Sequence, residues 1–192
     1  MNHSPQRNKT FFVRGFLPLG IVLGLVMFAH SALAFNYPGG GYKWAGSFPN
    51  VTVDYSGVGL NAWRVRIQNT MNDWNATGAK FKFVSGSSNN DILVTSCVEC
   101  RELMTSPITR QYGFTGPIVK AKTYINVAKQ WSPPDSAQYA YDFSSVMRHE
   151  QGHWLRLDHV SSGLMEGNFG WGEVQYVDSD ARSGIRHIYG VQ

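Results

Sequence analysis

The chain has 192 residues, of which 43% are hydrophobic, 14% aromatic and 16% charged. This length and composition suit one globular domain with a leader, and they exclude a mainly disordered chain and a collagen-like one. The formal net charge is +4, but residues 1–34 hold three basic and no acidic side chains, so the remainder is close to neutral. A nucleic-acid-binding protein needs a concentrated basic surface, and this sequence shows none, so we expect no nucleic-acid partner.

The first 34 residues have the pattern of a secretory signal peptide. Basic residues precede an apolar run over 15–29, and Ala32 and Ala34 then match the small-residue pattern ahead of a cut before Phe35. A transmembrane anchor is the alternative, but the strongly apolar run has about 15 residues and a membrane-spanning helix needs about 20. We therefore expect a signal peptide over 1–34 and one exported domain over 35–192, extracellular or, in a Gram-negative bacterium, periplasmic. We expect no stable membrane association after cleavage.

The first half of this domain alternates between strand and helix patterns. Residues 51–55 alternate apolar and polar side chains, which predicts a strand. Residues 60–74 carry apolar side chains in steps of three or four, which predicts a helix with one buried face. That face is expected to consist of Leu60, Trp63, Ile67, Met71 and Trp74.

The second half contains most of the expected strands and two further helices. Strands are expected at 80–84, 91–95, 109–116 and 121–128, followed by a proline-rich turn at 131–135.

Residues 143–155 are expected to form the second helix, with Asp142 or Ser144 as its N-cap. A short third helix is expected at 180–189, ended by Gly190. About five strands with helices outside the strand run predict an α+β or α/β domain in which helices cover a sheet.

A candidate zinc site lies between His149 and His159. His149 and His153 are four positions apart on the expected helix, so both imidazoles leave one face, at the spacing that a single zinc ion needs. Glu150 points elsewhere and is placed to act as general base toward a water on the metal. His159 can supply a third ligand if the helix ends near Leu155, which leaves the fourth position open, as a catalytic site requires.

Each of these residues also has another interpretation. Asp158 is an alternative third ligand, since carboxylates also bind zinc. The three histidines could instead be surface residues of an amphipathic helix. His187 on the third expected helix is interpreted as a solvated residue.

Cys97 and Cys100 form a C-x-x-C pair that allows three interpretations. In an exported protein a short local disulfide is expected. A redox-active dithiol and a metal site are the alternatives, and the chain has no second cysteine pair to complete four sulfur ligands.

The segment from His149 to His159 resembles the metzincin zinc-peptidase signature H-E-x-x-H-x-x-G-x-x-H. Six residues past His159, Met165 ends a segment that resembles the Met-turn of that clan. Within the clan the chain is most similar to the matrixins, over about 44–190. Four further segments carry this resemblance: Asp91–Val94, Tyr124–Val127 leading to Trp131, Phe143–Val146, and Gly184–Gly190.

The resemblance implies a metzincin-type α+β domain. It implies a twisted five-stranded mixed sheet, an active-site helix, a Met-turn in which Met165 packs beneath the metal, and a C-terminal helix. Arg156 occupies the position of the signature glycine, where the family's turn favours a positive φ, at a cost on the order of 1 kcal/mol for other residues. Outside the signature, the domain's only histidine is His187, so we expect one zinc ion, and no calcium-loop pattern appears.

These features together predict a secreted, monomeric zinc endopeptidase that cleaves protein or peptide substrates. The edge strand that would bind substrate is expected within 109–116, and a specificity pocket near 166–176. Two other hypotheses remain: a zinc-binding module that does not cleave, and a dithiol protein acting through Cys97 and Cys100.

Overall fold

The computed structural model describes residues 42–111, 116–132 and 140–192. The predicted signal peptide over 1–34 lies outside these residues, as do 112–115 of the strand expected at 109–116 and 133–135 of the expected turn.

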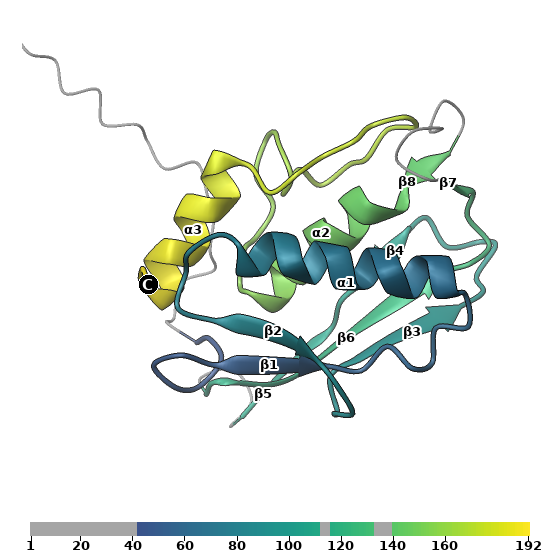
Figure 1. Ribbon diagram of the computed structural model, residues 1–192. Helices are drawn as coiled ribbons and strands as arrows, with labels where there is room; N and C mark the ends of the chain where they lie inside the picture. Colours follow the sequence, from purple (N-terminus) through teal and green to yellow (C-terminus); the bar gives the residue numbers. More distant parts are fainter. Residues whose placement is uncertain (1–41, 112–115, 133–139) are drawn as a thin grey trace, which may run out of the picture. The chain divides into compact units, whose positions relative to one another are not determined.

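Eight strands and three helices form within the described residues (Figure 1). In chain order they are β1 (Asn50–Val53), α1 (Asn61–Asn75), β2 (Lys82–Ser85), β3 (Asp91–Thr95), β4 (Met104–Thr105), β5 (Ile108–Arg110), β6 (Ile118–Asn126), β7 (Trp131–Ser132), β8 (Tyr141–Asp142), α2 (Phe143–Trp154) and α3 (Ser179–Tyr189).

The main ladders are mixed, as expected. β3 pairs in parallel with β6, while β4 and β5 both pair antiparallel with β6, and β1 and β2 form a separate parallel ladder. One parallel bridge, Asp54 to Asp91, joins β1 to β3. The described strands therefore form a four-stranded sheet and a two-stranded sheet that meet at this bridge. β7 and β8 form a separate short parallel pair.

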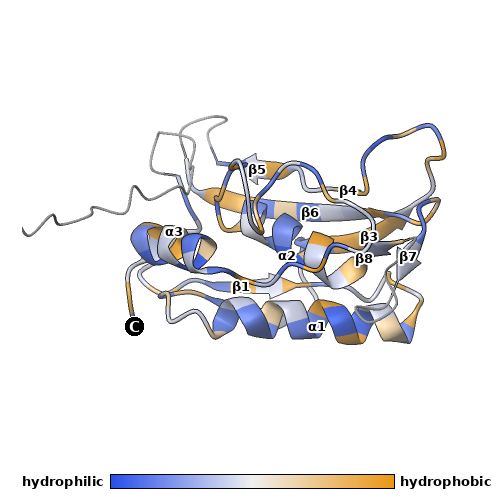
Figure 2. Ribbon diagram, turned by 90° about the horizontal axis from the view of Figure 1, so that it is seen from above, coloured by the Kyte–Doolittle hydropathy of each residue, from blue (hydrophilic) through white to orange (hydrophobic). Residues whose placement is uncertain are grey.

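Helices α1 and α2 lie on the same face of the strands, with α2 behind α1 (Figure 1). In the view from above, α2 lies across the middle of the strands and α1 lies along the edge next to β1 (Figure 2). Ile67, Met71 and Trp74 of α1 are fully buried, which confirms most of the predicted apolar face. Leu60 is the exception: it is the N-cap of α1 and its side chain is 57% exposed. The N-cap has extended backbone, so Leu60 does not share the buried face of the helix, which begins one residue later than expected.

The predicted edge strand at 109–116 is displaced. The antiparallel edge of β6 is formed by β4 and β5, which begin five residues earlier and are separated by Ser106 and Pro107. Proline has no N–H to donate to a neighbouring strand, so Pro107 divides this edge of the sheet into two short strands. The sequence therefore shows no continuous alternation of apolar and polar residues along the edge. Trp131 and Ser132, expected in a turn, form β7.

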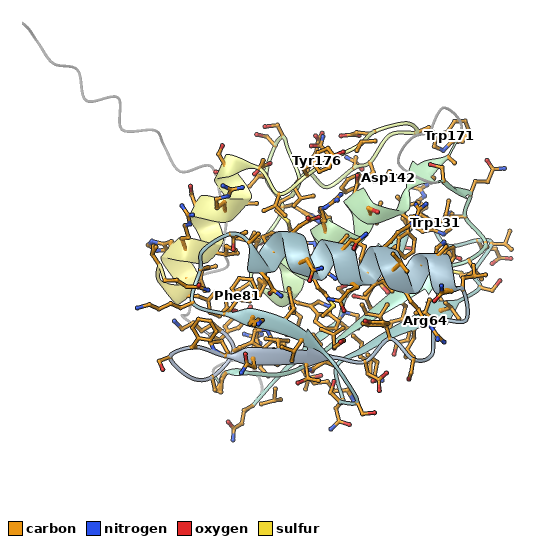
Figure 3. All side chains as sticks on the ribbon, viewed as in Figure 1. Arg64, Phe81, Trp131, Asp142, Trp171 and Tyr176 are labelled. Atoms are coloured by element: carbon orange, nitrogen blue, oxygen red, sulfur yellow. A yellow bond between two sulfur atoms is a disulfide. The ribbon has the colours of Figure 1, made fainter. Side chains whose placement is uncertain are left out.

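The core between sheet and helices is rich in aromatic side chains. Phe81, labelled in Figure 3, contacts the rings of Phe83 and Tyr189, and Phe83 contacts Trp154. The buried indole of Trp154 donates to the hydroxyl of Thr123 on β6, 3.0 Å away. This bond fixes the end of α2 against the sheet.

Within the part of the chain that the structure describes, no helix has the length and apolar character needed to cross a membrane.

Candidate metal centre

Helix α2 begins with a side-chain cap and is buried along almost its whole length. Asp142, labelled at the start of the helix in Figure 3, is the N-cap, and its Oδ1 accepts hydrogen bonds from the backbone N–H and the hydroxyl of Ser145. Of the two expected caps, Asp142 is therefore the one used. His149 is buried and His153 half-buried one helical turn later.

The helix ends in a turn that reverses the chain toward His159. The N–H of Leu157 donates to the carbonyl of Gly152, and the N–H of Arg156 to that of His153, at 3.0 and 2.9 Å. This is the Schellman arrangement, in which the residue after the C-cap has a left-handed backbone and is usually glycine. Here that residue is Arg156, with φ of 81°.

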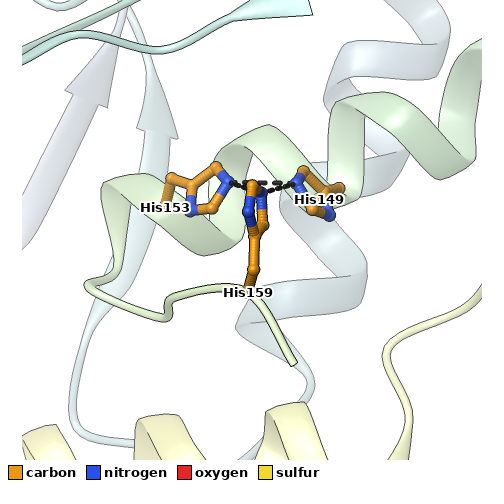
Figure 4. Close-up of side chains that lie close together, drawn as sticks. All are labelled: His149, His153 and His159. Atoms are coloured by element: carbon orange, nitrogen blue, oxygen red, sulfur yellow. Dashed lines mark hydrogen bonds between the residues drawn. The ribbon is translucent and has the colours of Figure 1, made fainter. Parts of the chain in front are cut away.

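This turn brings three imidazoles together. The Nε2 atoms of His149 and His153 are 3.0 Å apart, and each lies 3.2 Å from Nε2 of His159. Figure 4 shows the two helical histidines and His159, from the following loop, pointing at one another. They form the only group of three or more potential metal-binding side chains within the described ranges, and Asp158 is not part of it. Instead, Asp158 accepts a hydrogen bond from the backbone N–H of His159.

Hydrogen bonds on the far side of two rings determine which nitrogen faces the centre. Nδ1 of His149 donates to the carbonyl of Leu164 at 2.8 Å, and Nδ1 of His153 to that of Leu157 at 2.9 Å. A neutral imidazole that carries its proton on Nδ1 presents a lone pair at Nε2. The Nε2 atoms of His149 and His153, which lie close together, are therefore both hydrogen-bond acceptors.

The donor set fits zinc. A tetrahedral zinc with Zn–N bonds of about 2.0–2.1 Å separates its nitrogen ligands by roughly 3.3–3.4 Å, close to the observed triangle. Backbone carbonyls that bind Nδ1 of the ligating histidines are the usual outer partners of such a centre.

Burial keeps His149 and His153 neutral. It lowers the pKa of His149 to about 3, with a further contribution from the nearby His153. Burial likewise lowers the pKa of His153, against the opposing effect of its bond to Leu157. Neutral imidazole is the form that binds a metal ion.

Glu150 is buried beside the histidine cluster and lines the same cavity as His149 and His159. Its side chain is 7% exposed. Burial raises the pKa of this carboxyl to about 7, while a hydrogen bond from the Ser106 side chain acts in the opposite direction. A carboxyl with this pKa can accept and release a proton near neutral pH.

Met165 packs directly against helix α2. A Cβ placed on Gly152 would lie 2.5 Å from its sulfur and 3.3 Å from the Trp74 ring, so this contact requires glycine at position 152. Residues 163–166 form a hydrogen-bonded turn in which Met165 is buried.

Asp178 fixes the turn that contains Met165, a role that the sequence reading missed. Its carboxylate accepts from the backbone N–H of Leu164 and also caps α3 through the N–H of Ala181. An N-cap position was the only sequence signal, and it does not reveal the second bond.

A cavity of about 390 Å³ opens beside the cluster. The post-Met165 loop contributes Gly167, Asn168 and Phe169 to its wall, within the range predicted for a specificity pocket. The segment leading into β4 also lines the cavity, which the sequence did not indicate. The other lining residues are Arg101, Glu102, Leu103, Met104, Tyr141, Val146, His149, Glu150 and His159.

The remaining candidate residues lie outside the cluster. Cys97 and Cys100 are joined by a disulfide, and their loop is held by Asn126, whose side-chain amide donates to the carbonyl of Cys97, and by Lys129, which donates to that of Cys100. His187 is exposed on α3.

A comparison with known families identifies a match over most of the described chain. The family model described as Matrixin (Peptidase_M10) matches residues 61–190, which include α1, every strand from β2 onward, the histidine cluster and α3. No curated protein matches the chain significantly. The match covers more than half of the chain, and the chain therefore belongs to the matrixin family.

Proposed function

We propose that this protein is a zinc-dependent endopeptidase, with His149, His153 and His159 as ligands and Glu150 as general base. One observation carries the proposal: three histidine Nε2 atoms lie within 3.2 Å of one another, and the carboxyl of Glu150 lines the cavity beside them. Family membership supports a zinc metallopeptidase in general terms.

When bound, zinc supplies Lewis acidity, which lowers the pKa of water and polarises the carbonyl of the scissile peptide bond. The protein's part is to hold the three imidazoles in place. Leu164 and Leu157 do this for His149 and His153 through their carbonyls.

Glu150 is proposed to move the proton. Its carboxylate accepts a proton from the attacking water and then delivers it to the nitrogen of the leaving amine. The raised pKa suits both steps, because a group with pKa near 7 binds and releases a proton at similar cost near neutral pH.

The substrate is proposed to lie along β4. Among the described strands, β4 pairs with β6 alone, so its outer edge can accept main-chain hydrogen bonds from an extended peptide. A side chain of that peptide would enter the cavity, whose lining includes the apolar residues Leu103, Met104, Val146 and Phe169. Apolar side chains are expected to fit best there.

Export is a second part of the proposal and depends on residues 1–34 alone. If these act as a signal peptide, N-terminal sequencing of the protein from culture supernatant or periplasm will begin at Phe35. Recovery of the chain from the membrane fraction with an intact N-terminus would contradict it.

A chelator experiment tests the enzymatic part. The purified domain should hydrolyse casein, lose this activity with 1,10-phenanthroline, and regain it on addition of zinc. Hydrolysis that survives complete removal of metal would refute the proposal. So would zinc-loaded protein that cleaves no peptide in a broad substrate panel, which would favour a zinc-binding module without activity.

A further inference from the structure

The turn that carries the third histidine contains a strained residue. Arg156 is the only non-glycine residue with positive φ within the described ranges, and its φ of 81° lies in the region that favours glycine. Its side chain is nevertheless 4% exposed. Such a backbone persists only where surrounding contacts hold it.

Tyr42 supplies two of these contacts from 114 residues away in the chain. Nε of Arg156 donates to the Tyr42 carbonyl at 2.9 Å, and its guanidinium carbon lies 3.1 Å from the centre of the Tyr42 ring. Arg110 of β5 lies over the same ring, 3.8 Å from its centre. One tyrosine therefore contacts both the helix-terminating turn and the edge of the sheet.

The segment that contains Tyr42 is itself anchored. The carbonyl of Lys43 accepts from the N–H of Ile118, and Trp44 forms a parallel bridge with the same residue at the start of β6. The indole of Trp44 donates to the carbonyl of Trp154, the last residue of α2, at 2.8 Å. Tyr42 is thus placed by contacts to both the sheet and the helix end.

The turn that Arg156 begins affects two of the three histidines. The carbonyl of Leu157, the next residue, orients His153 through its Nδ1. His159 follows two residues later. A change in the backbone at Arg156 would therefore move both an outer partner of one ligand and the position of another.

We propose that Tyr42 is a positioning residue for the metal centre. By holding Arg156 in its left-handed conformation, it places His159 and the Leu157 carbonyl where zinc requires them. This inference rests on the three histidines being the zinc ligands, as proposed above, and not on the protein being a peptidase.

The test measures how Tyr42 substitutions change zinc affinity in the wild-type protein and in an Arg156→Gly variant. Zinc affinity is measured by competition with a chromophoric chelator. Tyr42→Ala removes the ring, so we expect zinc binding to weaken at least about tenfold, as when an outer partner of a ligand is lost. Tyr42→Phe keeps the ring and the main-chain carbonyl and should bind zinc within about twofold of wild type. In an Arg156→Gly background, glycine adopts the turn unaided, so adding Tyr42→Ala should change zinc affinity by less than about twofold.

Tyr55→Ala is the matched control. Tyr55 is also partly buried and hydrogen-bonded, to Gln68 of α1, but makes no contact with the turn. It should lower the thermal midpoint without weakening zinc binding. Wild-type zinc affinity in Tyr42→Ala, or an equal loss in both backgrounds, would overturn the inference. Peptide hydrolysis is not measured, so a failure of the proposed enzymatic activity leaves this result interpretable.

Discussion

Nδ1 of His149 donates a hydrogen bond to the carbonyl oxygen of Leu164, 2.8 Å away, and this bond connects helix α2 to the turn that contains Met165. The N–H of Leu164 in turn donates to Asp178, the N-cap of α3. One residue thus joins the candidate metal centre to the C-terminal helix. The orientation of the first histidine depends on the packing of a segment 15 residues later.

If the three clustered histidines bind zinc, replacing one of them should remove the metal. His153→Ala removes one of the three proposed nitrogen ligands, so the purified variant should retain less than about a tenth of the wild-type zinc. His187→Ala changes an exposed histidine of α3 and should retain one zinc per chain. Elemental analysis of both proteins after dialysis against a weak chelator provides the measurement. Equal zinc content in the two variants would show that the metal binds elsewhere.

We expect a side chain at position 152 to lower the stability of the protein, because Met165 occupies the space beside Gly152. Gly152→Ala places a methyl group 2.5 Å from the Met165 sulfur, and overpacking of this kind typically costs about 1–3 kcal/mol. Gly59→Ala is the control, since a Cβ there meets no atom within 4 Å. Urea denaturation should show a lower free energy of unfolding for the first variant only. Equal free energies of unfolding for the two variants would contradict the close packing of Met165 against Gly152 of α2.

Removing the Cys97–Cys100 disulfide should lower stability modestly and weaken substrate binding. The four-residue loop limits the entropic gain, so replacing both cysteines by serine should cost about 2 kcal/mol, the low end of the usual range. Arg101 and Glu102 follow this loop and line the cavity, so KM should rise while kcat stays within about twofold. A large fall in kcat in fully folded protein would instead favour a redox role for the pair.

Regular patterns in the sequence predicted most of the fold. The three-and-four spacing of Ile67, Met71 and Trp74 is a local consequence of helix geometry, and it located α1 to within a residue at each end. Residues 91–95, a short run rich in β-branched side chains, form β3 with the predicted bounds. By contrast, β4 has two residues, and its pairing depends on register with Ile125 and Tyr124 of β6, which no local pattern records.

The candidate site was predictable where spacing alone determines it. His149 and His153 must share a helix face, whereas the position of His159 depends on how the helix ends. Arg156 at a position that favours glycine left that turn uncertain. Its contacts with Tyr42 come from the other end of the domain and could not be inferred from neighbouring residues.

The most direct test of the account is a comparison of zinc content and hydrolysis rate in Glu150→Gln. Glutamine keeps the shape of the side chain but cannot accept the proton, so the variant should bind one zinc like wild type while its turnover falls at least about 100-fold, the lower end for a general base. Glu99→Gln, at an exposed position in the disulfide loop, should retain both properties. Near-normal hydrolysis by Glu150→Gln would contradict the account, because the base would then have to lie elsewhere.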